Sequence, residues 1–307
     1  MITTICMNPS FDKTVEVDSM TVGEMNRIRS ARVDMGGKGI NVAVVARRLG
    51  MDVRCVGCMG ADGAQRLTAM MDAEGLQHRF LTVEGSIRTN LKAVSLDGKG
   101  VTELNELGAP LSKHALEEFL ALACKETKDS DYVVVTGSLP PECPAGTYRM
   151  LMEALGDRRC ILDATGQELL LGLAAKPFLV KPNLSELSAT LGTELRTLRA
   201  IRDAALILLN KGAQNAVVSM GSMGAMLVGK EHTLYAPAVK VSPRSTVGAG
   251  DAMVGGMLLG LQRENSLMSA FRYGIAAGAA SVMTEGTQLL RTEDFNNLLS
   301  QVKIQEV

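Results

Sequence analysis

An acidic residue directly after a glycine-rich turn is the strongest chemical signal in this sequence. The segment STVGAGD at 245–251 places Gly248, Ala249 and Gly250 before Asp251, and a helical pattern follows. Small residues at a helix N-terminus let backbone N–H groups converge on an anion, aided by the helix dipole. A carboxylate beside that anion could take the proton of an attacking hydroxyl. The segment therefore indicates a phosphoryl-transfer site; a plain turn with Asp251 as helix cap is the alternative.

A second glycine-rich segment, MGGKGIN at 35–41, also precedes a helical pattern. Gly37 and Lys38 could offer backbone N–H groups and one cation to an anionic or hydroxyl-rich ligand, and Asn41 could bind a sugar hydroxyl. A glycine-rich loop with a solvated lysine is the alternative. The chain has no Walker P-loop, because no Gly-Lys pair is followed by Ser or Thr, and Met253 stands where a dinucleotide fingerprint needs its third glycine.

Two further segments have both a structural and a functional interpretation. In VKPNLSEL at 180–187, Asn183 and Glu186 have the spacing of a helix capping box. The functional interpretation places both residues near Mg²⁺ and nucleotide phosphates. In SMGSMG at 219–224, a strand end opens into a tight turn, which either passes close to a nucleotide or forms an ordinary hairpin.

The elements that must position these residues alternate between strand and helix. Continuous apolar runs suit strands that are buried on both faces, and such strands alternating with helices predict parallel βαβ units. We therefore expect an α/β fold with a central, mostly parallel, doubly wound sheet. The predicted strands lie in the runs ITTICM, VRCVGCM, YVVVTG, CILDAT, FLVKPN and NAVVSMG.

Two half-polar segments, at about 13–35 and 86–106, interrupt this alternation. Alternating polar and apolar residues are typical of a sheet with one wet face, so we expect a small β-sheet lid on a single domain covering 1–307. Arg27 and Arg88 lie in these segments. Arginine suits fork-like phosphate binding, although a solvated surface charge is the alternative for each.

Composition narrows the class of protein. The 307 residues carry a formal charge of −1, which argues against a nucleic-acid partner. No apolar run approaches the ~18 to 20 residues that span a bilayer, so no membrane partner is expected. Six cysteines, including Cys55 and Cys58 in an apolar run, suit core thiols in a reducing compartment. With no signal-like N-terminus, we expect a cytoplasmic protein.

Six motifs, taken in order, resemble the ribokinase/phosphofructokinase-B superfamily of sugar kinases. The resemblance implies a ribokinase-like fold, in which helices flank a large central sheet and a β-sheet lid covers the site. It also implies ATP and Mg²⁺ as cofactors and a homodimer formed through the lid. The motifs are NPSFD at 8–12, GGKGIN at 36–41, IRTN at 87–90, TGSLPP at 136–141, VKPNLSEL at 180–187 and STVGAGD at 245–251.

The resemblance also implies a role for each matching residue. Asp251 would be the catalytic base, and Gly248, Ala249 and Gly250 would form the anion hole. Asn183 and Glu186 would organise Mg²⁺, mainly through water. The implied sugar-phosphate ligands are Asp12, Arg27, Gly37, Lys38, Asn41, Arg88, Asn90 and Ser138. The implied ATP contacts are Lys181, Asn183, Ser219, Met220, Gly221, Ser222, Met223, Gly224 and Gly250.

The implied activity is ATP-dependent phosphorylation of the 6-hydroxyl of fructose 1-phosphate. Phosphorylation of the 1-hydroxyl of tagatose 6-phosphate is the first alternative, and a 6-phosphofructokinase reaction is the second. A regulator that binds a sugar phosphate on a kinase scaffold is the alternative from another class. The presence of Asp251 argues against that regulator, because a pure binder needs no base.

Overall fold

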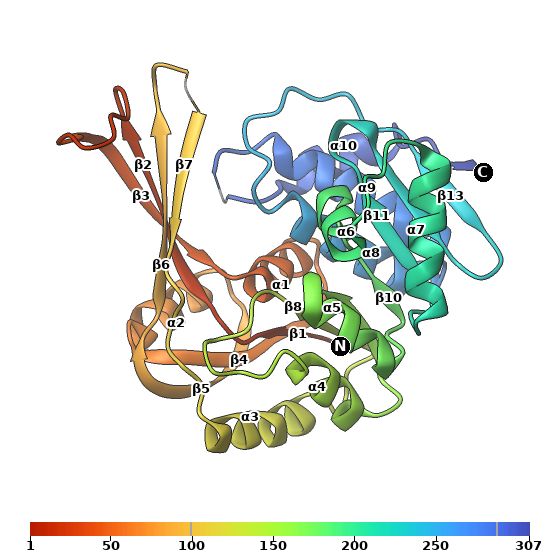
Figure 1. Cartoon of the computed structure of the whole chain (residues 1–307), viewed down its shortest axis with the longest axis horizontal. Helices are drawn as coiled ribbons and strands as arrows, with labels where there is room; N and C mark the ends of the chain where they lie inside the picture. The colour runs from red at the N-terminus through yellow and green to blue at the C-terminus, as the bar shows by residue number, and fades with distance from the viewer. Residues whose placement is uncertain (99, 287) are drawn as a thin grey trace.

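Two β-sheets organise the part of the chain that the computed structural model describes, residues 1–98, 100–286 and 288–307. The smaller sheet stands up from one end of the larger one (Figure 1). The strands of the larger sheet are β1 (Ile2–Cys6), β4 (Val53–Asp62), β5 (Gln77–Ser86), β8 (Tyr132–Thr136), β9 (Arg159–Asp163), β10 (Leu179–Val180), β11 (Ala216–Ser219), β12 (Ala225–Val228), β13 (Thr233–Ala236) and β14 (Gln305–Glu306).

The order of strands in the larger sheet is β14-β13-β12-β11-β10-β9-β8-β1-β4-β5. The strands from β5 to β11 pair in parallel, and β12, β13 and β14 add antiparallel pairs at the far edge. From β1 the chain moves to one side through β4 and β5, and later returns to build the other side from β8. Ligand sites in such sheets lie beyond the carboxyl ends of strands where this order reverses.

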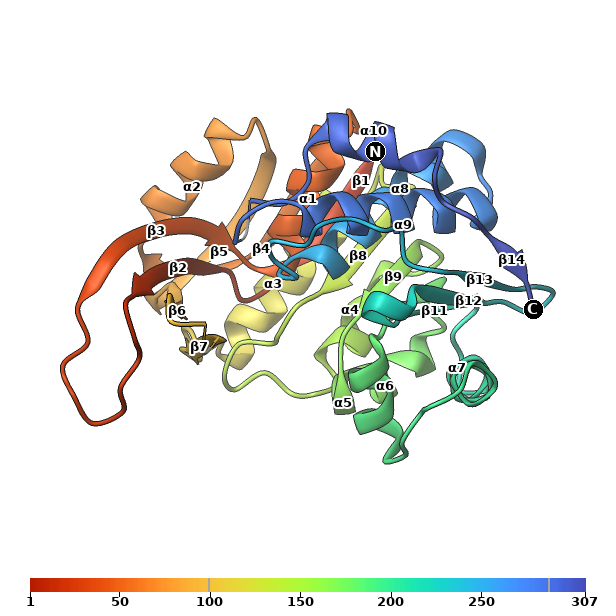
Figure 2. The ribbon, with the colours of Figure 1, turned by 90° about the horizontal axis from the view of Figure 1, so that it is seen from above.

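Helices cover both faces of the larger sheet (Figure 2). Within the described residues, no helix is both long and apolar enough to cross a bilayer. One face is covered by α1 (Lys38–Arg48), α2 (Ala64–Ala73), α8 (Ala249–Glu264), α9 (Leu267–Val282) and α10 (Thr292–Leu299). The other is covered by α3 (Lys113–Glu126), α4 (Thr147–Leu155), α5 (Gly166–Gly172), α6 (Leu184–Leu191) and α7 (Leu198–Asn210).

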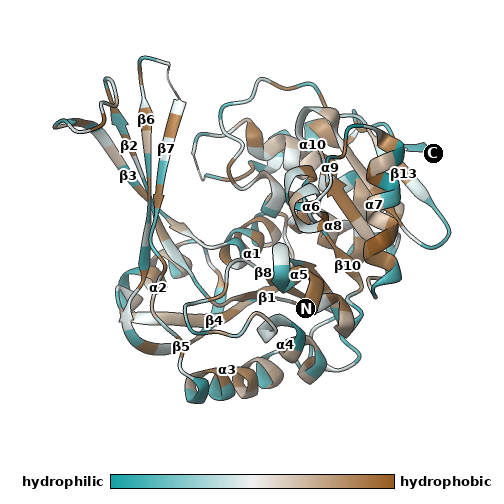
Figure 3. Cartoon of the chain, in the orientation of Figure 1, coloured by the Kyte–Doolittle hydropathy of each residue, from teal (hydrophilic) through white to brown (hydrophobic). Residues whose placement is uncertain are grey.

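The apolar runs of the sequence form the buried middle of this sheet. Every residue of β1 and of β8 is buried, as expected for strands that helices cover on both faces. Figure 3 shows the corresponding apolar colour along the central strands. Cys55 and Cys58 are buried in β4, so the prediction that they are core thiols is confirmed. The predicted α/β fold with a mostly parallel central sheet is confirmed as well.

The smaller sheet has the order β3-β2-β6-β7 and arises from the two half-polar segments. All six residues of β7 are exposed. In the predicted turn before β7, Lys99 lies outside the described residues. The strands are β2 (Ser10–Val17), β3 (Ile28–Gly36), β6 (Arg88–Ser95) and β7 (Gly100–Asn105).

Candidate active site

The glycine-rich turn at 245–251 ends in the first turn of α8. Gly248 precedes this helix with φ of 77°, and a Cβ placed there would lie 2.7 Å from the side chain of Leu289. Both the backbone conformation and the close packing therefore require glycine. The first N–H groups of a helix have no acceptor within it, and those of Gly250 and Asp251 donate to no other group among the described residues, so both can bind an anion. The N–H of Ala249 donates to the Thr246 carbonyl at 3.4 Å.

Asp251 is a buried carboxylate with one fixed hydrogen bond. Its side chain lies in the first turn of α8, and the residue is only 6% exposed. Asn41 Nδ2 donates to its Oδ2 at 2.8 Å. Burial, together with the negative charge of Asp163, raises the pKa of Asp251 to about 6. A carboxylate with this pKa suits general-base chemistry near neutral pH.

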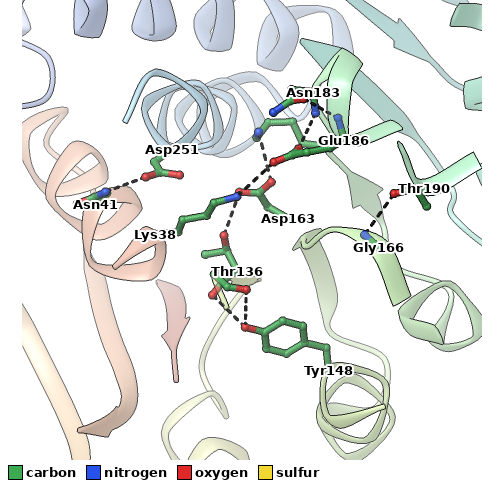
Figure 4. A network of polar contacts seen from close by, with 12 residues as sticks. Lys38, Asn41, Thr136, Tyr148, Asp163, Gly166, Asn183, Glu186, Thr190 and Asp251 are labelled. Atoms are coloured by element: carbon green, nitrogen blue, oxygen red, sulfur yellow. Dashed lines mark hydrogen bonds and ion pairs between the residues drawn. The ribbon is translucent and has the colours of Figure 1, made fainter. Parts of the chain in front are cut away.

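The first turn of α1 carries Lys38 and Asn41, which face different partners. Asn41 meets Asp251, whereas Lys38 Nζ lies 3.4 Å from Asp163 Oδ2 and 4.0 Å from Glu186 Oε1 (Figure 4). The sequence grouped Lys38 with the sugar ligands. The structure places its ammonium group toward β9 and α6, on the side where the capping box lies.

The glycines around Lys38 serve packing and chain direction. Gly37 joins β3 to α1 with φ of 109°, which a residue with a side chain rarely adopts. A Cβ on Gly39 would lie 2.4 Å from the Ile5 carbonyl oxygen. The start of α1 can therefore sit directly on the end of β1.

Asp163 is a site residue that the sequence reasoning missed. It ends β9 and is 1% exposed. Thr136 Oγ1 donates to its Oδ2 at 3.0 Å, and Lys181 Nζ lies 3.4 Å from its Oδ1. Burial acts to raise its pKa, but the charges of Lys181 and Lys38 outweigh burial and hold the pKa below its ordinary value. Its position offers a usable signal, since Asp163 follows an apolar run at the carboxyl end of a predicted parallel strand.

The predicted capping box at the start of α6 is confirmed. Asn183 Oδ1 accepts from the Glu186 N–H at 2.8 Å, and Glu186 Oε2 accepts from the Asn183 N–H at 2.8 Å. Glu186 Oε1 stays outside this pair and faces Lys38. The cap therefore fixes the carboxylate at the edge of the site and leaves one of its oxygens for a ligand.

The turn at 219–224 connects β11 and β12 as an antiparallel hairpin. Ser219 bridges to Asn183, so the turn begins beside the N-terminus of α6. A Cβ on Gly224 would lie 2.0 Å from the Ala236 carbonyl oxygen, which explains that glycine. Gly224, at the end of the turn, therefore has a packing role, and the start of the turn borders the site.

Asp12 belongs to a polar cluster at the base of the smaller sheet. Asp12 is 6% exposed and its Oδ1 accepts from Ser10 Oγ at 2.9 Å and from Asn90 Nδ2 at 3.0 Å. Its Oδ2 lies 3.3 Å from the buried ammonium of Lys92, which sequence reasoning also missed. The side chain of Asp12 lies over Gly36, where a Cβ would approach its Oδ1 to 2.4 Å. The structure thus brings together Asp12 and Asn90, two of the implied sugar-phosphate ligands.

Arg88 is a half-buried cation at the start of β6. Its Nε donates to the Asn8 carbonyl at 3.2 Å, and Asn8 Nδ2 donates to Ser138 Oγ at 3.4 Å. Burial lowers the pKa of Arg88. Within the described residues no carboxylate forms an ion pair with its guanidinium. A guanidinium placed in this way is suited to an anionic ligand.

Arg27 is the predicted site residue that lies apart from the others. It is exposed in the loop between β2 and β3, at the outer end of the smaller sheet (Figure 1). Ser10 pairs with Arg88 at the base of that sheet, and Val17 pairs with Ile28 at the outer end. Seven residues of extended strand separate these positions by roughly 23 Å. Within one chain, Arg27 and Arg88 therefore do not meet.

Sequence comparison supplies the family of the chain. A sequence model of the pfkB family of carbohydrate kinases matches residues 6–294. The chain belongs to the pfkB family of carbohydrate kinases. Curated relatives in this pfkB family include the 1-phosphofructokinases of Vibrio cholerae and Bacillus subtilis, each 34% identical over 307 residues. The alignments cover 99% of this chain and 96% and 99% of those two proteins.

Solved pfkB-type structures share the fold. Phosphofructokinase-2 from Escherichia coli, in complex with potassium, superimposes with a TM-score of 0.91 at 30% identity. The same enzyme in complex with fructose-6-phosphate gives a TM-score of 0.90 at 29% identity. Each comparison covers 98% of both chains. The predicted family and ribokinase-like fold are therefore confirmed over nearly the full length.

Proposed function

We propose that this chain is an ATP-dependent kinase that phosphorylates the 6-hydroxyl of fructose 1-phosphate. The observation that carries the proposal is the buried carboxylate of Asp251 at the N-terminus of α8, held by Asn41 and with a pKa near 6. Such a group is ionised at neutral pH and basic enough to accept a hydroxyl proton. The 1-phosphofructokinases at 34% identity support the same substrate.

The transfer step needs a proton acceptor and a place for negative charge. The Asp251 carboxylate takes the proton of the sugar hydroxyl while the hydroxyl oxygen forms a bond to the γ-phosphorus of ATP. The bond from that phosphorus to the β–γ bridging oxygen breaks, and ADP leaves with the electron pair. The N–H groups of Gly250 and Asp251, with the helix dipole, stabilise the charge on the transferring group. Ala249 contributes less, because its N–H already has an acceptor.

The sugar phosphate would lie across the base of the smaller sheet, which would close over it as a lid. Asp12 would accept hydrogen bonds from sugar hydroxyls, and Arg88 would pair with the existing phosphate, with Ser138 nearby. Arg88 supports a phosphorylated substrate over a neutral sugar, because a neutral sugar would leave this half-buried cation unpaired. Arg32 Nη2 donates to the Glu285 carbonyl at 3.3 Å, a contact between the smaller sheet and the main body that a lid would make.

ATP would enter between the turn at 219–224 and Lys181, and Mg²⁺ would accompany it. Glu186 offers one carboxylate oxygen outside the capping box, and Asn183 stands beside it. This sparse donor set fits Mg²⁺, which keeps several waters and takes one or two carboxylates plus phosphates. The bound ion would offset the charge of the β- and γ-phosphates. Turnover should stop in excess chelator and return on addition of Mg²⁺; full activity in chelator would contradict this.

A coupled ADP-release assay tests the substrate. The purified protein is compared on fructose 1-phosphate, tagatose 6-phosphate, fructose 6-phosphate and free fructose at equal concentrations. We expect the highest kcat/KM with fructose 1-phosphate and a loss of at least about 10³-fold with free fructose, as two or three lost charged contacts imply. Higher kcat/KM with fructose 6-phosphate would instead assign the reaction of phosphofructokinase-2. ATP turnover with none of the sugars would leave the regulator as the better interpretation.

We further propose that two chains associate through the lid. Large apolar side chains are exposed on the smaller sheet and the segments that follow its strands, and Figure 3 shows apolar colour on β7. The exposed side chains are Val22, Met25, Ile28, Leu96, Val101, Leu104 and Leu107. Light scattering should report a dimer, and Val101→Glu should yield monomers. A monomeric wild-type protein at assay concentration would contradict the proposal.

A further inference from the structure

The base of the smaller sheet holds a buried ion pair between two neighbouring strands. Lys92 Nζ on β6 lies 3.3 Å from Asp12 Oδ2 on β2, and the two side chains are 10% and 9% exposed. The other carboxylate oxygen of Asp12 accepts from Ser10 and Asn90. Within the described residues, Lys92 forms no other ion pair. Because little water reaches this pair, the charge of Asp12 is balanced by Lys92.

The strand register places this ion pair on the same face of the sheet as Arg88. Alternate residues of a strand share a face, so Arg88, Asn90 and Lys92 point to the same side of β6. Asn90 is the register partner of Asp12 on β2. Its Oδ1 is buried and has no hydrogen-bond partner among the described residues. A ligand hydroxyl could donate to this oxygen, so the face that carries the ion pair is suited to a sugar.

The charges on this face leave Arg88 as the excess cation. On β3, Asp34 Oδ2 lies 2.9 Å from Arg32 Nε. That ion pair and the pair of Asp12 with Lys92 carry no net charge, whereas Arg88 forms no ion pair within the described part of the chain. Burial lowers the pKa of Arg88, and the charge of Asp12 acts in the opposite direction, so the field of Asp12 reaches the guanidinium. A phosphate bound at Arg88 would feel that charge as repulsion unless Lys92 offset it.

We propose that Lys92 is a positioning residue that neutralises Asp12 and thereby allows the site to hold a sugar phosphate beside a carboxylate. This inference rests on the proposed kinase function and deepens it, since it names a determinant of the preference for phosphorylated over neutral sugars. Lys92 acts through Asp12, because it fixes the carboxylate for the sugar hydroxyls and offsets its charge toward the phosphate. Without Lys92, the charge of Asp12 would cancel that of Arg88, and the site would lose its attraction for an anion.

Two single substitutions should change substrate preference in opposite directions. The readout is the preference ratio, defined as kcat/KM for fructose 1-phosphate divided by kcat/KM for free fructose. Lys92→Met leaves the charge of Asp12 unbalanced, so the ratio should fall at least about 10-fold. Asp12→Asn leaves the charge of Lys92 unbalanced, so the ratio should rise by a similar factor. Losses that both sugars share, such as a missing hydroxyl contact, cancel in the ratio, so a purely structural role would not produce opposite shifts.

Three further variants control for charge and for folding. The double variant Asp12→Asn/Lys92→Met removes both charges and should return the ratio to within about 3-fold of the wild type. Lys92→Arg keeps the charge and should keep the ratio, and Lys211→Met, at an exposed lysine that ends α7, should also leave it in place. Shifts of the two single variants in the same direction, or an unchanged ratio in Lys92→Met, would overturn the inference. If Lys92→Met does not fold, Asp12→Asn and the double variant still decide.

Direct binding and the choice of sugar separate this inference from the proposed function. Calorimetry without ATP should show fructose 1-phosphate binding at least about 10-fold more weakly to Lys92→Met than to the wild type, while KM for ATP stays unchanged. If the wild type phosphorylates fructose 1-phosphate and Lys92→Met keeps its ratio, the proposed function stands and the inference fails. If the wild type prefers tagatose 6-phosphate or fructose 6-phosphate, the proposed function fails, and opposite shifts measured with that sugar phosphate support the inference.

Discussion

Replacing the buried carboxylate of Asp251 with an amide should abolish turnover and make the protein more stable. Asp251→Asn keeps the size of the side chain, and its carbonyl oxygen still accepts the hydrogen bond from Asn41. The proton acceptor is lost, so kcat should fall by at least about 10² to 10⁴-fold. ATP and sugar phosphate should still bind, because neither depends on the charge of this group.

The gain in stability follows from the pKa of about 6, compared with 3.8 for an ordinary aspartate. Between these values the folded protein binds more protons than the unfolded chain, so stability falls as pH rises through this range. Above pH 6 the full cost applies, and about two pKa units correspond to roughly 3 kcal/mol. Below pH 3.8 both states are protonated and the cost vanishes. Asp251→Asn removes the cost, so it should stabilise the protein at pH 8 and progressively less toward pH 4.

Thermal unfolding at pH 8 and pH 5, with the ADP-release assay beside it, measures both effects. A gain of roughly 3 kcal/mol corresponds to a rise in Tm of about 5 °C or more for a chain of this size. The rise should shrink at pH 5, where the wild-type carboxyl group is largely protonated. A variant within a few-fold of wild-type kcat would exclude Asp251 as the base. A Tm that is unchanged or lower at pH 8 would refute the burial argument.

Three further predictions concern the pH profile, the sugar phosphate and the packing of α1. The kcat/KM of the wild type should fall as pH drops through about 6, and a flat profile down to pH 5 would contradict a base of that pKa. Arg88→Ala should raise KM for fructose 1-phosphate about 10- to 100-fold and leave KM for ATP unchanged, whereas Arg199→Ala, at an exposed arginine, should change neither. Gly39→Ala should lower the free energy of unfolding by about 1–3 kcal/mol, because the added Cβ would clash with the end of β1. The control Gly146→Ala should lower it by about 0.5 kcal/mol or less, because a Cβ there has no atom within contact distance. Equal losses in the two variants would refute the close approach of α1 to β1.

The overall fold was accessible from the sequence because its signals are local. The all-apolar runs of β1 and β8 predict doubly covered strands, and both are buried throughout. The helix α2, at 64–73, follows the predicted strand VRCVGCM, as the alternation of strands and helices requires. The edge strand β5 was not predicted, because its alternation of exposed and half-buried residues gives no apolar run. The short strands β12, β13 and β14 were likewise missed, since four residues or fewer carry little periodicity.

The sequence predicted only those parts of the site whose residues lie together in one short motif. Asp251 with its glycines and the box of Asn183 and Glu186 are such segments, and the box was confirmed. The partners of Lys38 were not predictable, because α1 presents that residue and Asn41 to opposite neighbours that only the assembled sheet supplies. Asp163 was missed for the same reason, since its lysines lie 125 residues before it and 18 residues after it in the sequence.

The chain leaves the larger sheet to form strands of the smaller sheet and returns to it at almost the same point. β1 ends at Cys6, β2 begins at Ser10, and β3 ends at Gly36, one residue before α1. Without residues 10–36, β1 would lead directly into α1 and β4 as an ordinary βαβ unit. Asp12 and Arg88 reside in the sheet built from such excursions, whereas Asp251 resides in the underlying scaffold. Under the roles proposed for these residues, mutations that change which sugar is accepted fall in an inserted module, apart from the residue proposed as the base. Sugar specificity and phosphoryl transfer would then be free to evolve separately.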